Sequence, residues 1–504
     1  MLNVLFITAD QWRGECLGVA GHPVVKTPNL DAFAADATTF LNHYSNAAPC
    51  SPARATLYTG LYQMTNRVVR NGSPLSARFD NVAKAARRVG YSPALFGYTD
   101  QSADPTVLPP DDPWLRTYEG VLPGFDVRVR LPEDEKVWLS WLRGQGLDFA
   151  NRNLAHLPAR DVGKVSNAPP AYNKDQTQTA FLTDEFIRWL GEQDAPWFAH
   201  LSLLRPHPPF IVPEPYNTMF SPDDVSGFRR AGSVAEEAAV HPLVQLALAA
   251  TPTDSFVPGA SGRVADLSET EFRQIKATYF GMIAEVDAQL GRVFAAVRAA
   301  GAWDNTLIIF MSDHAELMGD HYLLGKGGYH DQSQNVPLII RNPEAGAQGN
   351  RVEAFTEHVD IYPTLLEIIF AKPGQVGDGR SLTPFLDGQT PPAWRDAAHW
   401  EFDFRDVASQ VPETALRLNS TELNLAVIRT AKWKYVHFAA LPPLLFDLGA
   451  DPDNLRNVAD DPAYATVRIE MAERLLSWRA RHLDQSLALK ELTPNGVVSR
   501  EVVR

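Results

Sequence analysis

The sequence is poor in cysteine. Only Cys16 and Cys50 occur among its 504 residues, which excludes a disulfide framework. No apolar run approaches the ~18 residues of a membrane-spanning helix. The first residues lack the basic stretch that opens a secretory signal. These absences predict a cytoplasmic protein with no membrane partner.

Basic residues are also in short supply. Lys and Arg number 46 against 60 Asp and Glu, which gives a formal net charge of -14. A broad basic face of the kind that binds nucleic acid is therefore not expected. Net charge says little about a single cleft, so a local pocket for a small anionic ester remains compatible with this composition.

The residues that are present are typical of an α/β protein. Hydrophobic residues make up 45% of the chain, which is enough for a large core. The continuous apolar run 4–7 is typical of a strand buried on both faces of a sheet, and further strand candidates occur at 93–97, 197–204 and 306–311. Helical patterns alternate with them, at 27–40, 53–61, 80–89 and 271–300. This alternation predicts a large mixed sheet flanked by helices.

The chain divides into three predicted regions. Residues 1–375 would form the catalytic domain, in which the Pro-, Asp- and Gly-rich stretch 104–180 would be a long insertion over the sheet edge. Shorter patterned pieces then predict a small antiparallel sheet with one late helix, in a subdomain spanning 376–482. The polar tail 483–504 is a candidate oligomer contact.

The strongest local signal surrounds the second cysteine. It reads Cys50-Ser51-Pro52-Ala53-Arg54, with Thr59-Gly60 five residues after the arginine. A cysteine-dependent phosphatase would need five residues between Cys and Arg, a thiol protease would need a His partner, and a zinc thiolate site would need companion ligands. A buried structural cysteine is the remaining alternative, and it is the simplest interpretation of the isolated Cys16.

This pattern resembles the sulfatase segment that a formylglycine-generating enzyme oxidises to an aldehyde. The resemblance implies that Cys50 becomes formylglycine and acts as the nucleophile. The hydrated aldehyde would offer one oxygen for attack on phosphorus or sulfur. Its second hydroxyl could then lose a proton, so that the hydrate collapses and expels the product. Arg54 would lie one helical turn away and could hold the hydrate in place.

Acidic and imidazole side chains follow two of the predicted strands. Asp10 ends the first apolar run, and Asp313 and His314 follow the run at 306–311. A parallel sheet can bring both ends to one edge, where ligands bind in open α/β sheets. Two carboxylates and one imidazole, completed by the Cys50-derived oxygen, would hold one divalent metal ion. The simpler alternative is a helix-capping Asp and an ordinary surface His.

Over most of its length the chain resembles the sulfatase branch of the alkaline phosphatase superfamily. The matching segments occur in the family's order, at Asp10-Gln11, 50–60, 312–314, 325–329 and 445–452. Typical arylsulfatases have two adjacent Asp where this chain has Asp10-Gln11, and Asp-Asn where it has Asp313-His314. A ligand set with an imidazole and fewer carboxylates suits Mn²⁺, Fe²⁺ or Zn²⁺ better than Ca²⁺, and Mn²⁺ is favoured.

The same departures resemble the phosphonate monoester hydrolases within that branch. Segments 70–75, 97–100 and 204–210 are similar to that group's segments. The resemblance implies that His207 and Lys326 are catalytic and stabilise charge on the transferring or leaving oxygens. It also implies that the substrate is bound by Gln11, Asn71, Tyr98 and Thr99. Ordinary structural roles remain open for these residues, such as a turn at Asn71-Gly72, a loop at Tyr98-Thr99 or a structural His207 among prolines.

The sequence thus predicts metal-dependent hydrolysis of phosphonate monoesters and phosphodiesters, with sulfate monoesters also accepted. The alternative is an arylsulfatase or another sulfuric ester hydrolase, such as a choline-sulfatase-like enzyme. The resemblance further implies a homo-oligomer, either a tetramer or a dimer. Apart from the small anionic ester and the formylglycine-generating enzyme, no other partner is expected.

Overall fold

A computed structural model describes residues 1–160, 162, 165–194, 196–225 and 227–500. Within these residues, nine strands form one large sheet with the order β4-β3-β5-β1-β6-β7-β2-β8, and β9 pairs with β2. The pairing is mixed, because β7 runs antiparallel to both β6 and β2. The strands are β1 (Asn3–Ala9), β2 (Thr38–Tyr44), β3 (Ala94–Gly97), β4 (Asp126–Arg130), β5 (Phe198–Leu203), β6 (Thr306–Met311), β7 (Asn335–Arg341), β8 (Asn350–Val352) and β9 (Thr356–Glu357). The predicted α/β architecture is confirmed.

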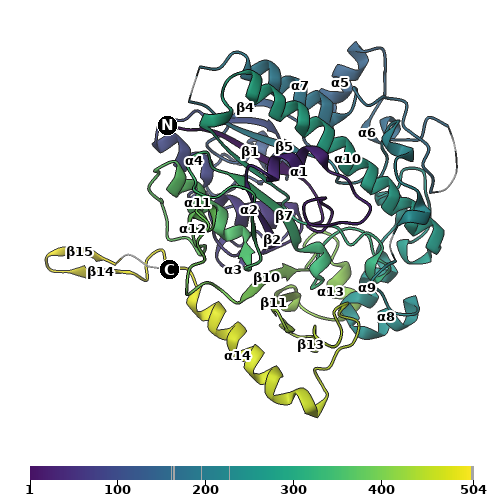
Figure 1. Ribbon diagram of the computed structural model, residues 1–504. Helices are drawn as coiled ribbons and strands as arrows, with labels where there is room; N and C mark the ends of the chain where they lie inside the picture. The colour runs from purple at the N-terminus through teal and green to yellow at the C-terminus, as the bar shows by residue number, and fades with distance from the viewer. Residues whose placement is uncertain (161, 163–164, 195, 226, 501–504) are drawn as a thin grey trace.

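The core lies on both faces of this sheet, as the continuous apolar runs predict. Successive side chains of β1 point to opposite faces, so Leu5 and Ile7 join one cluster while Val4 and Phe6 join the other. The first face is covered by α1 (Pro28–Ala34), α5 (Lys136–Gly144), α7 (Gln178–Leu190) and α10 (Glu269–Ala299). The opposite face is covered by α2 (Cys50–Thr59), α4 (Val82–Arg88), α11 (Ile361–Ile368) and α12 (Thr383–Leu386) (Figure 1). Among the described residues, no helix combines the length and the apolar character that a membrane crossing requires.

The C-terminal part contains the antiparallel sheet that the sequence predicts. Its strands lie in chain order, and α14 (Ala465–Arg481) packs on β11 and β12. The strands are β10 (Ala397–Asp403), β11 (Asn424–Thr430), β12 (Trp433–Phe438) and β13 (Leu444–Asp447). Shorter helices complete the chain: α3 (Gln63–Asn66), α6 (Arg152–Ala155), α8 (Val234–Val240), α9 (Pro242–Ala250) and α13 (Val411–Leu416).

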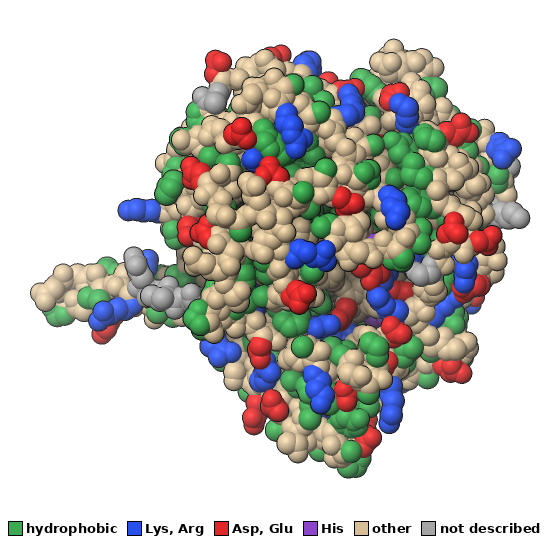
Figure 2. Space-filling model, in the orientation of Figure 1, with side chains coloured by type: hydrophobic (Ala, Val, Ile, Leu, Met, Phe, Trp, Pro, Cys, Tyr) green, Lys and Arg blue, Asp and Glu red, His purple; other side chains and the backbone are tan. Residues whose placement is uncertain are grey.

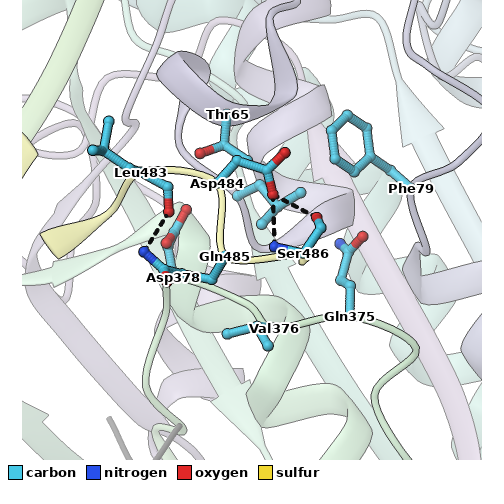
Figure 3. A pocket seen from close by; sticks show the side chains of 10 residues that line it. Thr65, Phe79, Gln375, Val376, Asp378, Leu483, Asp484, Gln485 and Ser486 are labelled. Carbon is cyan, nitrogen blue, oxygen red and sulfur yellow. Dashed lines mark hydrogen bonds between the residues drawn. The ribbon is translucent and has the colours of Figure 1, made fainter. Parts of the chain in front are cut away.

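The chain after α14 first packs against the rest of the protein and then projects away from it. Residues 483–486 lie beside Thr65, Gln375 and Val376 (Figure 3). The cavity between them is about 10 Å³, which is room for roughly one water molecule and too little for a substrate. Beyond it, β14 (Lys490–Thr493) and β15 (Gly496–Ser499) form a hairpin that projects from the molecule (Figure 1).

Two sequence predictions need correction. The helical pattern at 27–40 forms only the seven-residue α1, and the chain then enters β2, so Phe40 belongs to a strand. The stretch 104–180 is more than an insertion, because β4 extends the central sheet beside β3 and α5 packs into the main core. Here the strand Asp126–Arg130 is short and rich in charged residues, since it lies at the sheet edge.

Candidate active site

The two acidic strand ends meet at one edge of the central sheet. β1 and β6 are neighbouring parallel strands, paired from Asn3 with Thr306 to Thr8 with Met311. Asp10 follows the first strand directly, and Asp313 follows the second after one residue. Two residues 303 positions apart are thereby brought side by side by strand pairing, as the sequence predicts.

Cys50 is the first residue of α2, and the whole of this helix is buried. Pro52 lies in the first turn, where its missing N–H costs nothing. The helix ends at Gly60, which has φ +67° and packs against Tyr362 so closely that a Cβ would lie 2.9 Å from it. This placement sets Cys50 Sγ 3.2 Å from His314 Nε2.

Asp10, Cys50, Asp313 and His314 form a compact ligand set. One ligand atom from each lies within 4.8 Å of all the others, and all four residues are buried. No group among the described residues donates a hydrogen bond to Asp10 Oδ1, although buried carboxylate oxygens normally accept one. An orphaned carboxylate oxygen beside a second carboxylate and an imidazole fits a divalent cation. These residues therefore suit the metal that the sequence predicts.

Electrostatics at this cluster favours an anionic Asp10 and a neutral Cys50. Burial opposes ionisation of Asp10, but the charges of His314 and Arg54 outweigh it and lower the pKa of its carboxyl. Burial and the negative charge of Asp10 raise the pKa of the Cys50 thiol well above its ordinary value. An unmodified Cys50 is thus a protonated thiol and a poor nucleophile.

Arg54 forms ion pairs with both carboxylates. Its Nε lies 2.8 Å from Asp313 Oδ2 and its Nη2 lies 3.3 Å from Asp10 Oδ2. Nη1 donates to Ser202 Oγ at 2.9 Å, and the guanidinium lies over the Tyr98 ring at 4.2 Å. The Tyr98 hydroxyl donates to Asp10 Oδ2. Arg54 and Tyr98 therefore hold the carboxylates in place, and Arg54 offsets their charge.

Gln11 connects the strand end to Lys326. Lys326 Nζ donates to Gln11 Oε1 at 2.6 Å, and Gln11 Nε2 donates to Glu316 Oε2. Gln11 itself has φ +67°, a conformation that is uncommon outside glycine and is found at functional sites. Lys326 is only partly buried, so it presents a cation at the edge of the cluster.

The remaining predicted residues lie around the cluster in different ways. His207 is partly buried, and its Nδ1 lies 2.7 Å from Pro208 O, so Nδ1 carries the proton and Nε2 is left for other contacts. Burial and the nearby charge of Lys326 lower the pKa of His207 well below its ordinary value. Asn71 Oδ1 accepts from Ser51 N at 3.0 Å and so anchors the start of α2.

Thr99 is held in the fold by both hydrogen bonds of its hydroxyl. Its hydroxyl donates to Gly120 O at 3.1 Å and accepts from Leu122 N at 2.8 Å, and the residue is fully buried. These bonds fix the loop after β3. A substrate-binding role for Thr99 stays a prediction.

Sequence reasoning missed three residues that touch the site. Glu316 bonds Gln11, Ser202 bonds Arg54, and His358 Nε2 donates to Asp313 O at 2.7 Å. Burial raises the pKa of Glu316 to about 7. A signal existed for Glu316, an acidic residue two positions after His314. None existed for Ser202, which lies in β5, or for His358, which directly follows β9, because only the folded chain brings them to the site.

Comparison with known proteins decides the family. The sulfatase family profile matches residues 2–369, which is most of the chain. The chain belongs to the sulfatase family. A second profile, for the C-terminal part of N-sulphoglucosamine sulphohydrolase, matches residues 319–481 of this sulfatase family member.

Three similar proteins narrow the comparison within the family. The multifunctional alkaline phosphatase superfamily protein PehA of Trinickia caryophylli is 41% identical over 99% of both chains. The phosphonate monoester hydrolase of Agrobacterium radiobacter is 58% identical, with a TM-score of 0.98 over 100% of both chains. The phosphonate monoester hydrolase of Silicibacter pomeroyi is 37% identical, with a TM-score of 0.93 over 99% of both chains. The resemblance read from the sequence is confirmed.

Proposed function

We propose that this protein hydrolyses phosphonate monoesters and phosphodiesters, and that it also accepts sulfate monoesters. The observation that carries the proposal is the ligand set of Asp10, Cys50, Asp313 and His314, which has Gln11 and Lys326 beside it. Similarity to phosphonate monoester hydrolases over the full chain supports this choice of substrate.

The carboxylates and the imidazole of the site would bind the metal. Asp10, Asp313 and His314 would hold a divalent metal, with Mn²⁺ favoured, together with the oxygen of a formylglycine derived from Cys50. The metal would supply Lewis-acid activation of the nucleophile and of the ester oxygens. Maturation of Cys50 requires a formylglycine-generating enzyme as partner.

The cationic and imidazole side chains would act on the ester itself. Arg54 would orient the group derived from Cys50 at the start of α2. Lys326 would stabilise negative charge on the non-bridging oxygens, because its Nζ reaches the cluster edge through Gln11. His207 Nε2 would face the leaving oxygen, and Tyr98 would keep Asp10 in position. Asn71 and Thr99 would shape the wall of the site.

A substrate panel tests the proposed function. Matched p-nitrophenyl esters of phenylphosphonate, of a phosphate diester and of sulfate would be compared by kcat/KM on the matured enzyme. We expect the two phosphorus esters to be turned over at least as well as the sulfate. A sulfate kcat/KM that exceeds both by about a hundredfold would favour the alternative, a true sulfatase such as an arylsulfatase or a choline-sulfatase-like enzyme.

We also propose a homo-oligomer, a tetramer or a dimer, in which the hairpin β14-β15 contacts a second copy. Leu492 and Val497 are directly paired across the hairpin, and their side chains are 83% and 62% exposed. An isolated two-stranded hairpin is marginally stable in water, so an exposed apolar pair on one of its faces favours a partner surface.

No broad basic area is seen on the face in Figure 2, where charges of both signs are mixed. The cytoplasmic location stays a prediction.

Replacing both Leu492 and Val497 by Asp is expected to lower the molar mass in solution, because two charges cannot be buried against a partner without a large cost. Light scattering coupled to size exclusion measures the change. Glu491→Gln, on the opposite face of the same strand, is the matched control and should leave the mass unchanged. An unaltered mass in the double variant would show that the hairpin does not hold the oligomer together.

A further inference from the structure

An apolar cavity adjoins the site at Lys326. Its volume is about 330 Å³. Its walls come from α9, from the loop between β6 and β7, and from the segment that runs from β10 into α13. For comparison, a buried cavity of roughly 150 Å³ already accepts a benzene ring. Lys326 belongs to both, because it lines the cavity while its Nζ bonds Gln11 in the site.

In the loop that carries Lys326, a glycine allows an aromatic side chain to pack closely. Gly327 has φ +118°, and a Cβ there would lie 2.8 Å from the Phe402 ring. Phe402 stacks on Phe404, with ring centroids 6.3 Å apart and planes 19° apart. Leu243 and Val244 of α9 face this wall and are buried. The wall and the helix thus enclose an apolar space next to the reacting group.

Of the titratable residues that line the cavity in the described part of the chain, Asp406 is ion-paired and His330 is neutral. Asp406 forms an ion pair with Arg70 at 2.8 Å, and Arg70 precedes Asn71, which anchors α2. His330 is buried, and burial together with its neighbour His321 lowers the pKa of its imidazole, so the ring is neutral. The remaining charged group among the described lining residues is the cation Lys326. A cationic group such as choline would be repelled by it, whereas an uncharged ring or alkyl chain would not.

We propose that this cavity receives an uncharged apolar group of the ester substrate, an aryl or longer alkyl substituent, while its phosphorus or sulfur centre lies at Asp10 and Cys50. The inference rests on the proposed function and assigns its substrate class. The substituent has two possible sources, the departing alcohol or the group that stays on phosphorus. Both share the same chemistry, and the experiment separates them.

Filling the cavity from one wall tests the assignment. Ala247 on α9 lines the cavity, so Ala247→Trp should occupy it. Ala249 on the same helix is exposed and does not line it, so Ala249→Trp is the matched control. Three substrates would be compared: monomethyl methylphosphonate, monobenzyl methylphosphonate and monomethyl phenylphosphonate. Product formation is followed by phosphorus NMR, and each variant is compared with wild type on the same ester, which cancels intrinsic reactivity.

With Ala247→Trp, kcat/KM should fall at least about tenfold for one of the two bulky esters and less than about twofold for monomethyl methylphosphonate. Loss on the benzyl ester assigns the cavity to the departing alcohol, and loss on the phenylphosphonate assigns it to the retained group. Ala249→Trp should match wild type on all three esters. If Ala247→Trp does not fold, Val411→Trp fills the cavity from the opposite wall and carries the same expectation.

Equal ratios on all three esters in a folded variant would overturn the assignment and leave the proposed function intact. Wild-type enzyme that turns over none of the three phosphonates, while hydrolysing sulfate esters, would instead contradict the proposed function. A fall in kcat/KM on monobenzyl methylphosphonate or on monomethyl phenylphosphonate that occurs only in the cavity variants supports both.

Discussion

Replacing Cys50 by alanine is expected to lower kcat by at least about four orders of magnitude on every ester substrate, because the variant retains no atom that can attack phosphorus or sulfur. KM should change much less. Lys326 and His207 would still bind the anionic ester, because among the described residues Lys326 Nζ bonds Gln11 and His207 Nδ1 bonds Pro208 O, and neither bond involves Cys50 Sγ. Steady-state kinetics on a phosphonate and a sulfate ester measures both parameters.

Cys16 supplies the matched control. It is the only other cysteine in the chain, it is buried in the core, where its backbone oxygen accepts a hydrogen bond from Trp12 Nε1, and it does not belong to the metal-ligand cluster. Cys16→Ala should keep kcat within about a factor of two, with only a modest loss of stability from the small cavity. A Cys50→Ala enzyme that retained a tenth of wild-type kcat or more would refute the nucleophile assignment.

The chemical state of Cys50 is checked on the same protein. Conversion to formylglycine removes a sulfur and two hydrogens and adds one oxygen, so the peptide that contains Cys50 should lose the corresponding mass. Activity across preparations should rise with the converted fraction. Active protein whose Cys50 peptide shows only unmodified cysteine would contradict the proposal, since burial and Asp10 keep that thiol protonated.

Much of the fold could be predicted because its signals are local. The runs that became β1, β5 and β6 are rich in apolar residues, and each strand is completely buried in the sheet. The strand that departs from this pattern, β4, is short and charged, and it was missed because an edge strand buries little. Propensity could not separate the end of α1 from the start of β2, where only three residues intervene.

The residues of the candidate site also include some that the sequence predicts and some that it does not. Asp10 and Asp313 could be predicted because each lies within two residues of the end of a recognisable strand, and the parallel pairing of the two strands brings them together. Ser202 and His358 could not, because each reaches the site through a side-chain contact between distant segments. Glu316 carries a signal in its position two residues after His314, but its bond to Gln11 could not be predicted either. Such contacts depend on side-chain direction in the folded chain, which a sequence pattern does not encode. The apolar cavity is invisible in sequence for the same reason, since its walls come from three separate stretches.

Removal of the metal is expected to have the second large effect. Chelation should lower kcat by about three orders of magnitude, because Lewis-acid activation would be lost while the binding groups remain. Mn²⁺ should restore more activity than Ca²⁺, since one member of the ligand set is the His314 imidazole and Ca²⁺ prefers oxygen. Elemental analysis of the purified enzyme should find one divalent ion per chain, a readout that does not depend on turnover.

His314→Asn separates the ligand from the rest of the site. The amide replaces an imidazole nitrogen by an oxygen, so Mn²⁺ affinity should fall by about ten- to a hundredfold and the advantage of Mn²⁺ over Ca²⁺ should shrink. His22→Asn is the control, because that ring packs on Phe280 and accepts bonds from its own loop. Unchanged metal content and unchanged metal preference in His314→Asn would exclude His314 from the ligand set. A loss of content with the preference retained would instead show that the imidazole strengthens binding without selecting the ion.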